Sequence, residues 1–147
     1  MDAPKETSKK PSATKAESLL EQSTFFVDRS LGRALGAKLR AAGWNVELHD
    51  EHFPENAKDE EWLVEVGAKG WVVLTKDKAI RKKAVEKQAV IEAKVRMFTL
   101  PSGQMTGEEM ADVYLSNRMK IARFLKKNKA PFIAVVYKDA AIHRCDI

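Results

Sequence analysis

The feature of this sequence that most constrains its fold is the alternation of short apolar runs with segments of helical character. The apolar runs, rich in β-branched and aromatic residues, occupy residues 25–27, 44–48, 71–74, 95–100 and 131–137. Helix-compatible segments separate them, including the four-residue spacing of Leu31, Leu35 and Leu39. Strands that alternate with helices pair in parallel through right-handed crossovers. The order therefore predicts one α/β domain of three layers, with a mostly parallel central sheet flanked by helices.

The N-terminal segment differs in composition from the rest of the chain. Residues 1–22 are rich in Lys, Ser, Thr, Glu and Ala and contain almost no apolar residue before Leu19 and Leu20. Segments of this kind bury too little apolar surface to offset the entropy of ordering. We therefore expect a disordered polar tail over residues 1–22 and a folded domain over residues 23–147, which is room for a single core.

Several features of the sequence indicate a cytoplasmic protein without membrane contact. Fully apolar runs are short, as in Ile133–Val136, whereas a spanning helix needs about 20 residues. The first residues are polar and lack the apolar core of a secretory signal. The single cysteine, Cys145, has no partner within the chain for a disulfide.

The formal net charge of +5 hides a strong segregation of charge along the chain. Residues 44–61 hold seven acidic side chains and one basic side chain, whereas residues 76–96 hold eight basic and three acidic ones. Residues 116–129 hold six basic side chains and no acidic one. An acidic centre between basic segments suits a site that binds cations beside a polyanion. The alternative is that both basic segments are solvated helix faces.

Acidic residues follow two of the predicted strands. Asp28 comes directly after the run 25–27, Asp77 comes shortly after the run 71–74, and Asp59 opens the helix between them. The carboxyl ends of parallel strands share one edge of the sheet, which is where ligands bind in such folds. Clustered carboxylates repel one another and need a cation or raised pKa values. Oxygen ligands favour Mg²⁺ or Mn²⁺, although each acid could instead cap a helix.

The same residues resemble the PIN-like domain family, which includes the VapC-type toxins of toxin–antitoxin pairs. The likeness begins with Asp28 after an apolar strand and continues through Gly43-Trp44-Asn45-Val46 and Asp59-Glu60-Glu61-Trp62-Leu63. Its clearest part is Trp71-Val72-Val73-Leu74-Thr75-Lys76-Asp77, which is similar to the "strand, Leu-Thr, basic residue, Asp" element of the compact PIN-like branch. It covers about residues 24–100.

The resemblance implies a metal-dependent endoribonuclease with one or two Mg²⁺ or Mn²⁺ ions. Carried over by position, the metal-binding and catalytic residues are Asp28, Asp59 and Asp77. Glu60 takes the place of Asp59 if the helix register differs by one residue. In such a site the metal activates a water molecule and stabilises the leaving oxygen of a phosphodiester.

Other features of the family pattern are less complete in this chain. Thr75 stands where the family often has a hydroxyl group, which would orient a carboxylate or a water molecule. PIN sites often contain a fourth acid, for which no motif is present. Glu92 and Asp139 are candidates only because they lie near predicted strands.

RNA is the partner that the resemblance and the basic segments together imply. The candidate RNA-binding residues are Lys76, Lys78, Arg81, Arg118, Lys120 and Arg123. An antitoxin protein and a second copy of the chain are further partners that the resemblance allows.

Three alternatives remain from the sequence. The same fold could serve as a non-catalytic module that binds RNA or protein. A receiver-like phosphoacceptor domain also places acids at strand ends, but it has adjacent acids after its first strand, where this chain has only Asp28. His49 and His52 have a spacing compatible with zinc, and His143 and Cys145 could complete four ligands only through a geometry that the sequence does not show.

Overall fold

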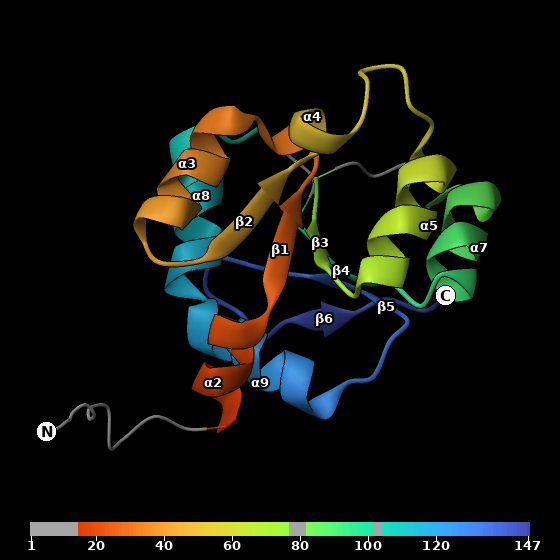
Figure 1. Cartoon of the computed structure of the whole chain (residues 1–147). Helices are drawn as coiled ribbons and strands as arrows, with labels where there is room; N and C mark the ends of the chain where they lie inside the picture. The colour runs from red at the N-terminus through yellow and green to blue at the C-terminus, as the bar shows by residue number, and fades with distance from the viewer. Residues whose placement is uncertain (1–14, 77–81, 102–103) are drawn as a thin grey trace, which may run out of the picture.

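The computed structural model describes residues 15–76, 82–101 and 104–147, and within them a six-stranded sheet forms the centre of the molecule (Figure 1). Its strands are β1 (Thr24–Val27), β2 (Asn45–Leu48), β3 (Val72–Leu74), β4 (Arg96–Thr99), β5 (Phe132–Val135) and β6 (His143–Arg144). They lie in the order β2-β1-β3-β4-β5-β6. The first five pair in parallel and β6 pairs antiparallel to β5. The predicted mostly parallel sheet is therefore confirmed.

Helices cover both faces of the sheet, which gives the predicted three layers (Figure 1). They are α2 (Lys15–Gln22), α3 (Arg33–Ala41), α4 (His49–His52), α5 (Asp59–Lys69), α7 (Ala84–Glu92), α8 (Gly107–Ser116) and α9 (Arg118–Lys127), with a 3-10 turn η1 (Arg29–Leu31). Helices α2, α3, α8 and α9 pack on one face, and α5 and α7 pack on the other.

Strand β1 shows why the apolar runs do not alternate with polar residues. Phe25 and Val27 enter the core beneath α3 and α8, whereas Phe26 enters the core beneath α5 and α7. All three side chains are at most 1% exposed. A strand buried on both faces reads as a continuous apolar run, which is the pattern of a parallel sheet.

The outer edge of β2 is covered by a side chain from α3. Arg40 donates from Nε (3.1 Å) and Nη2 (2.7 Å) to the carbonyl oxygen of Val46, and it forms an ion pair with Glu51 at 2.9 Å. On the inner side, α3 approaches β2 closely because Gly36 has no side chain where Leu48 packs.

The prediction of a disordered tail is wrong for its last eight residues. Residues 15–22 form α2, which packs against α9, and Leu20 is only 5% exposed. The leucine pair at the end of the polar segment therefore anchors a helical turn that composition alone does not indicate. Residues 1–14 lie outside the described residues, so for them disorder remains a prediction.

The capping-box pattern Thr106-Gly107-Glu108-Glu109 predicts one long helix to about residue 127, whereas the structure has two helices there. The start is as predicted, because Thr106 and Glu109 form a reciprocal capping box at 3.1 and 2.8 Å. The break falls at the buried Asn117, whose Nδ2 donates to the carbonyl oxygens of Val113 (2.6 Å) and Tyr137 (3.1 Å). The amide thus ties the end of α8 to the segment after β5, which is a tertiary contact that helical periodicity does not reveal.

Two shorter elements also differ from expectation. The polar sequence around Pro54 predicts a loop over residues 49–58, which instead begins with the helical turn α4. The segment after residue 137 reads as a short polar C-terminal tail, but it contains the short strand β6. No helix of the described segments is long and apolar enough to cross a membrane.

The packing of α5 on the end of α7 depends on Gly67. A Cβ atom there would meet the carbonyl oxygen of Ala93, which is backbone and cannot rotate away. We expect Gly67→Ala to lower the free energy of unfolding by about 1–3 kcal/mol, as overpacking does. Gly107→Ala is the matched control, because a Cβ there meets nothing within 4 Å. Urea unfolding of both variants is the measurement, and equal stabilities would contradict the expectation.

Candidate functional site

The carboxyl end of β1 places Asp28 at the edge of the sheet, in line with the backbone ladder. Its backbone N–H donates to the carbonyl oxygen of Leu74 at the end of β3 (3.0 Å). The chain then turns into η1, and the Asp28 side chain is left 6% exposed. Asp28 therefore directly follows a buried strand, as the sequence predicted.

Two hydroxyl groups hold the Asp28 carboxylate. The Oγ of Ser30 and the Oγ1 of Thr75 both donate to Oδ2, each at 2.8 Å. Within the described ranges, Oδ1 receives no hydrogen bond and no Lys or Arg forms an ion pair with this carboxylate. Among the described residues, this carboxylate therefore has only neutral donors and lacks the opposite charge that usually compensates a buried carboxylate.

The backbone of Thr75 is in turn held by a side chain of α8. Tyr114 is fully buried, and its hydroxyl group donates to the carbonyl oxygen of Thr75 (3.2 Å). Burial, with the charge of Asp28 as a second cause, raises the pKa of Tyr114 far above its ordinary value. The phenol therefore stays protonated and remains a donor. Tyr114, expected only in the core, also fixes the end of β3.

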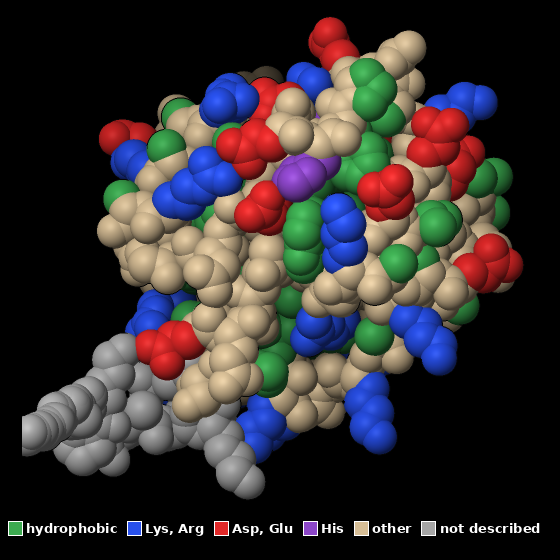
Figure 2. All heavy atoms as spheres, in the orientation of Figure 1, with side chains coloured by type: hydrophobic (Ala, Val, Ile, Leu, Met, Phe, Trp, Pro, Cys, Tyr) green, Lys and Arg blue, Asp and Glu red, His purple; other side chains and the backbone are tan. Residues whose placement is uncertain are grey.

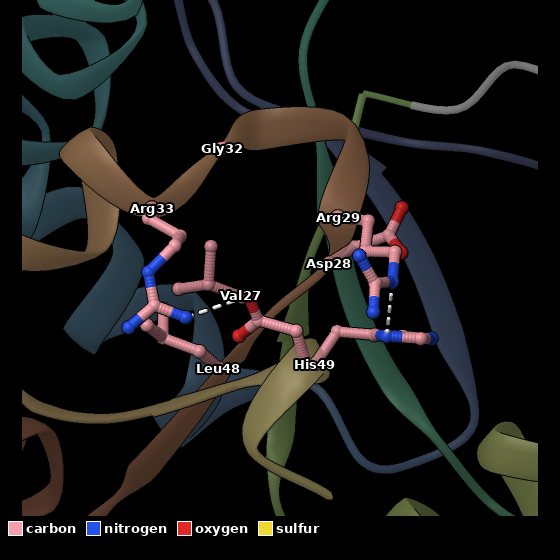
Figure 3. A pocket seen from close by; sticks show the side chains of 8 residues that line it. Val27, Asp28, Arg29, Gly32, Arg33, Leu48 and His49 are labelled. Atoms are coloured by element: carbon pink, nitrogen blue, oxygen red, sulfur yellow. Dashed lines mark hydrogen bonds and ion pairs between the residues drawn. The ribbon is translucent and has the colours of Figure 1, made fainter. Parts of the chain in front are cut away.

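His49 lies beside Asp28, on the neighbouring strand end. Its Nδ1 accepts a hydrogen bond from Arg29 Nε (3.1 Å), and Figure 3 shows the two side chains facing each other. The ring is 3% exposed and packs against Phe26 and Trp62. Burial lowers the pKa of His49, and the charge of Asp28 only partly opposes that effect. Because Nδ1 accepts from Arg29, the neutral form of the imidazole carries its proton on Nε2.

A small pocket of about 90 Å³ lies next to these groups (Figure 3). It is lined by Val27, Asp28, Arg29, Gly32, Arg33, Leu48, His49 and Asp50. Asp50 Oδ2 forms an ion pair with Arg33 Nη1 (2.6 Å), while its Oδ1 is buried with no partner among the described residues. Sequence reasoning missed Asp50 as a neighbour of Asp28. The signal was its place just after the strand at residues 44–48.

Asp59 lies at the same end of the sheet. It is the first residue of α5 after the N-cap Lys58, one position from the expected cap, and its Oδ1 accepts from Trp62 Nε1 (3.0 Å). The Trp62 ring meets the His49 ring edge-on, with centroids 5.7 Å apart. Glu60 instead lines a groove between α5 and α7. The choice between Asp59 and Glu60 as a site residue remains a prediction.

Part of the predicted site falls outside the described residues. Asp77, Lys78 and Arg81 lie there, so their roles remain predictions. Lys76 is described, and its backbone N–H donates to Ser30 Oγ (3.2 Å). Its side chain is exposed at the same edge as Asp28.

Three of the candidate RNA-binding residues lie away from Asp28. Arg118, Lys120 and Arg123 belong to α9, which lies beside α2 near the start of β1 (Figure 1). Arg118 lines a hollow with Gly43 and Trp44, which precede β2. The strand crossovers thus separate this basic segment from the edge that carries Asp28.

Neither suggested fourth acid lies beside Asp28. Glu92 ends α7 and therefore lies where β4 begins, at the opposite edge. Asp139 follows β5, which is three strands from β1, a separation of about 14 Å at about 4.8 Å per strand. Both side chains are exposed.

The histidines do not form the four-ligand group considered for zinc. His49 binds Arg29, whereas His52 Nε2 contacts Glu47 Oε1 at 2.6 Å. Glu47, Glu51 and His52 are the one group of at least three possible ligands that the described residues bring within 4.8 Å. His143 and Cys145 are not part of it. The contacts of Glu51 with Arg40 (2.9 Å) and the backbone N–H of Leu48 (3.0 Å) explain this group without a metal.

Figure 2 shows acidic side chains gathered over α4 and the start of α5, around a histidine on the same face. The predicted acidic centre of residues 44–61 is thus a surface feature beside the Asp28 edge. Basic side chains on this face lie between the acidic ones and in the lower part of the view.

Comparisons with known proteins match this region of the chain. The model of the PIN like domain family matches residues 23–102, which is more than half of the chain. The Mycobacterium tuberculosis protein named "Putative ribonuclease VapC45" is 32% identical over 123 residues, covering 80% of this chain and 88% of that protein. No solved structure matches the chain significantly.

The lowered pKa of His49 predicts a pH dependence of stability. Below about pH 6.5, the ordinary pKa of histidine, the unfolded chain gains a proton that the folded chain resists. Stability should therefore fall as the pH drops through that value and recover above it. We expect thermal melts of His49→Gln to show a smaller loss between neutral and mildly acidic pH than the native protein. His143→Gln, on exposed β6, is the control and should follow the native curve; identical curves for His49→Gln would contradict the assignment.

Proposed function

Because the chain belongs to the PIN-like domain family, we propose that it is a metal-dependent endoribonuclease that hydrolyses RNA phosphodiesters. The relative named as a ribonuclease supports this proposal. The observation that carries it is the buried Asp28 carboxylate, which two hydroxyl groups hold at the strand edge without a cationic partner among the described residues.

The donor set fits Mg²⁺ or Mn²⁺. Among the described residues, the Oδ1 of Asp28 is left for a ligand because Ser30 and Thr75 both bind Oδ2. Asp59 begins its helix at the same end of the sheet, and Asp77 follows β3 along the chain. Carboxylate oxygens of this kind suit hard divalent cations. When bound, the cation would lower the pKa of a water molecule and offset charge on the leaving oxygen.

The other residues at this edge would orient the site and hold the RNA. Ser30 and Thr75 hold the Asp28 carboxylate, and Tyr114 holds the backbone carbonyl group of Thr75. Arg29 holds His49 in one tautomer. Lys76 presents an exposed amine beside Asp28, where an RNA phosphate would lie if its phosphodiester reached the carboxylates. Lys78 and Arg81 are proposed to extend this contact.

We propose further that the protein is the toxin of a toxin–antitoxin pair, as its resemblance to VapC-type proteins suggests. The test is genetic. Expression of the chain should arrest growth, and co-expression of a small DNA-binding protein encoded beside it should relieve the arrest. Arrest by the Asp28→Asn variant would separate any toxicity from the proposed chemistry.

A non-catalytic module that binds RNA or protein is the second candidate. The distance of Glu92 and Asp139 from Asp28 favours it, because the site then has fewer acids than a full PIN site. Such a module would bind RNA without metal-dependent cleavage.

Metal binding gives the first test. Mn²⁺ or Mg²⁺ should raise the melting temperature of the native protein, since a ligand at about 100 times its Kd stabilises by about 2.7 kcal/mol. The Asp28→Asn, Asp77→Asn double variant should lose this response and should melt no lower than the native protein without metal, because carboxylate repulsion is relieved. Asp139→Asn is the matched control and should keep the response. Equal metal responses in the double variant and the native protein would contradict the site.

Cleavage gives the second test. We expect slow cleavage of single-stranded RNA with Mn²⁺ or Mg²⁺, and a loss of orders of magnitude in each of Asp28→Asn, Asp59→Asn and Asp77→Asn, with folding retained. Glu60→Gln should be milder, since Glu60 faces α7. The absence of metal-dependent cleavage in the native protein, with RNA binding unchanged in all variants, would favour the binding module. Cleavage that persists in all three variants would indicate a contaminating nuclease.

A further inference from the structure

Arg29 lines the pocket beside Asp28 and has no carboxylate partner among the described residues. Two arginines line this pocket, Arg29 and Arg33. Arg33 forms an ion pair with Asp50 at 2.6 Å, so its charge is compensated. Arg29 is exposed, and no carboxylate of the described ranges forms an ion pair with it. Arg29 is therefore the cation that this pocket offers to a ligand.

The Arg29 side chain is held by a histidine rather than by an acid. Its Nε donates to Nδ1 of His49 (3.1 Å), and Figure 3 shows the two side chains facing each other beside Asp28. Because an arginine side chain can only donate, Nδ1 is the acceptor and carries no proton. The Nη1 and Nη2 groups of Arg29 have no partner within the described ranges. The histidine thus orients the guanidinium group without compensating its charge.

His49 can serve as this anchor because the core encloses its ring. The side chain is 3% exposed. The ring packs against the rings of Phe26, Phe53 and Trp62, with centroids 5.9, 5.5 and 5.7 Å away. A ring enclosed on several sides has little freedom to follow the arginine. It therefore determines where the guanidinium group points.

The backbone of Arg29 is fixed as well. Arg29 opens the turn η1, between Asp28 and Ser30. The carbonyl oxygen of Asp28 accepts from the backbone N–H of Leu31 (3.0 Å), and that of Arg29 accepts from the backbone N–H of Gly32 (3.1 Å). Ser30 Oγ donates to Asp28 Oδ2 at 2.8 Å. The turn that holds the carboxylate therefore also holds the arginine next to it.

An oriented guanidinium group with free nitrogen atoms suits a phosphate group. Its planar fork of N–H donors matches two phosphate oxygens, and the charge strengthens both hydrogen bonds. The acidic side chains over α4 and the start of α5 repel a polyanion on this face. RNA that reaches the Asp28 edge therefore needs cations fixed there. Arg29 provides one beside the carboxylate, and the exposed Lys76 provides another at the same edge.

We propose that Arg29 binds a backbone phosphate of RNA in the pocket beside Asp28, and that His49 is its positioning residue. The inference rests on the proposed function, because it names the group that holds the substrate at that site. Nη1 and Nη2 contact the phosphate, while Nε keeps its bond to His49, since the three groups are separate donors. The arginine is thus ordered before RNA arrives, which lowers the entropy cost of binding.

The first test measures RNA binding without cleavage. The full chain is titrated into a fluorescently labelled single-stranded RNA oligonucleotide in EDTA, and fluorescence anisotropy gives Kd over a series of salt concentrations. Arg29→Gln should weaken binding about tenfold, as the loss of a hydrogen bond between charged groups does. It should also reduce the slope of log K against log salt by about 0.7, the value for one phosphate contact on a single strand. Lys38→Gln is the control for lost charge and should change neither quantity, because Glu108 already pairs with Lys38.

Three further variants separate orientation from charge. Arg29→Lys keeps the charge but not the fork, so affinity should fall several-fold while the salt slope stays. His49→Leu removes the acceptor and should have the same effect. His49→Asn should restore the native affinity, because its Oδ1 is an acceptor as many bonds from Cβ as Nδ1 is. Circular dichroism and thermal melts check folding; if His49→Leu does not fold, the comparison of Arg29→Lys with Arg29→Gln carries the test.

Other results would overturn the proposal. An unchanged Kd and salt slope in Arg29→Gln would reject the phosphate contact. Native affinity in Arg29→Lys or in folded His49→Leu would reject the positioning by His49. Cleavage assays separate this inference from the proposed function. Metal-dependent cleavage with an unchanged KM in Arg29→Gln would reject the inference and leave the nuclease. Weaker RNA binding by Arg29→Gln, with no metal-dependent cleavage by the native protein, would reject the nuclease and leave Arg29 as an RNA contact.

Discussion

The ladder of hydrogen bonds between β1 and β3 is the constraint on which the candidate site depends. It places Asp28 beside Thr75, because the backbone N–H of Asp28 bonds to Leu74 and the next residue, Thr75, bonds to Phe98. The hydroxyl group of Thr75 then reaches the Asp28 carboxylate across the strand boundary. A shift of one residue in this register would move every side chain of β3 to the other face of the sheet. The position of the acid is thus fixed by backbone pairing before any ligand is considered.

Support for this edge comes from beyond the segment that the family model matches. Tyr114 lies on α8, after residue 102, and it holds the carbonyl group of Thr75 from within the core. Phe124 on α9 packs against β4 and β5 through Phe98 and Phe132. The C-terminal helices therefore cover one sheet face and stiffen the end of β3. The acids and the scaffold that aligns them belong to different parts of the sequence.

The sequence predicts those features of the fold that depend on residues close together in the chain. The buried strand before Asp28 and the capping box at Thr106 both follow from residues that lie side by side in the chain. Features that depend on contacts across the fold are not predictable in this way, such as the break at Asn117 or the approach of Asp50 to Asp28. Arg118 illustrates the same limit. It lies beside Gly43 and Trp44, where β2 begins, and the charge composition of its helix does not reveal this position.

The Arg40 contact with β2 has a consequence for how the protein behaves at high concentration. An exposed edge strand offers unpaired backbone groups to strands of other molecules, which is a common route to aggregation. Here two nitrogen atoms of one guanidinium group bind the carbonyl oxygen of Val46. The added positive charge and bulk on the edge also oppose the approach of another strand. Arg40 thus opposes amyloid-like pairing at the β2 edge of this sheet. In many folds a covering helix or a proline has this effect.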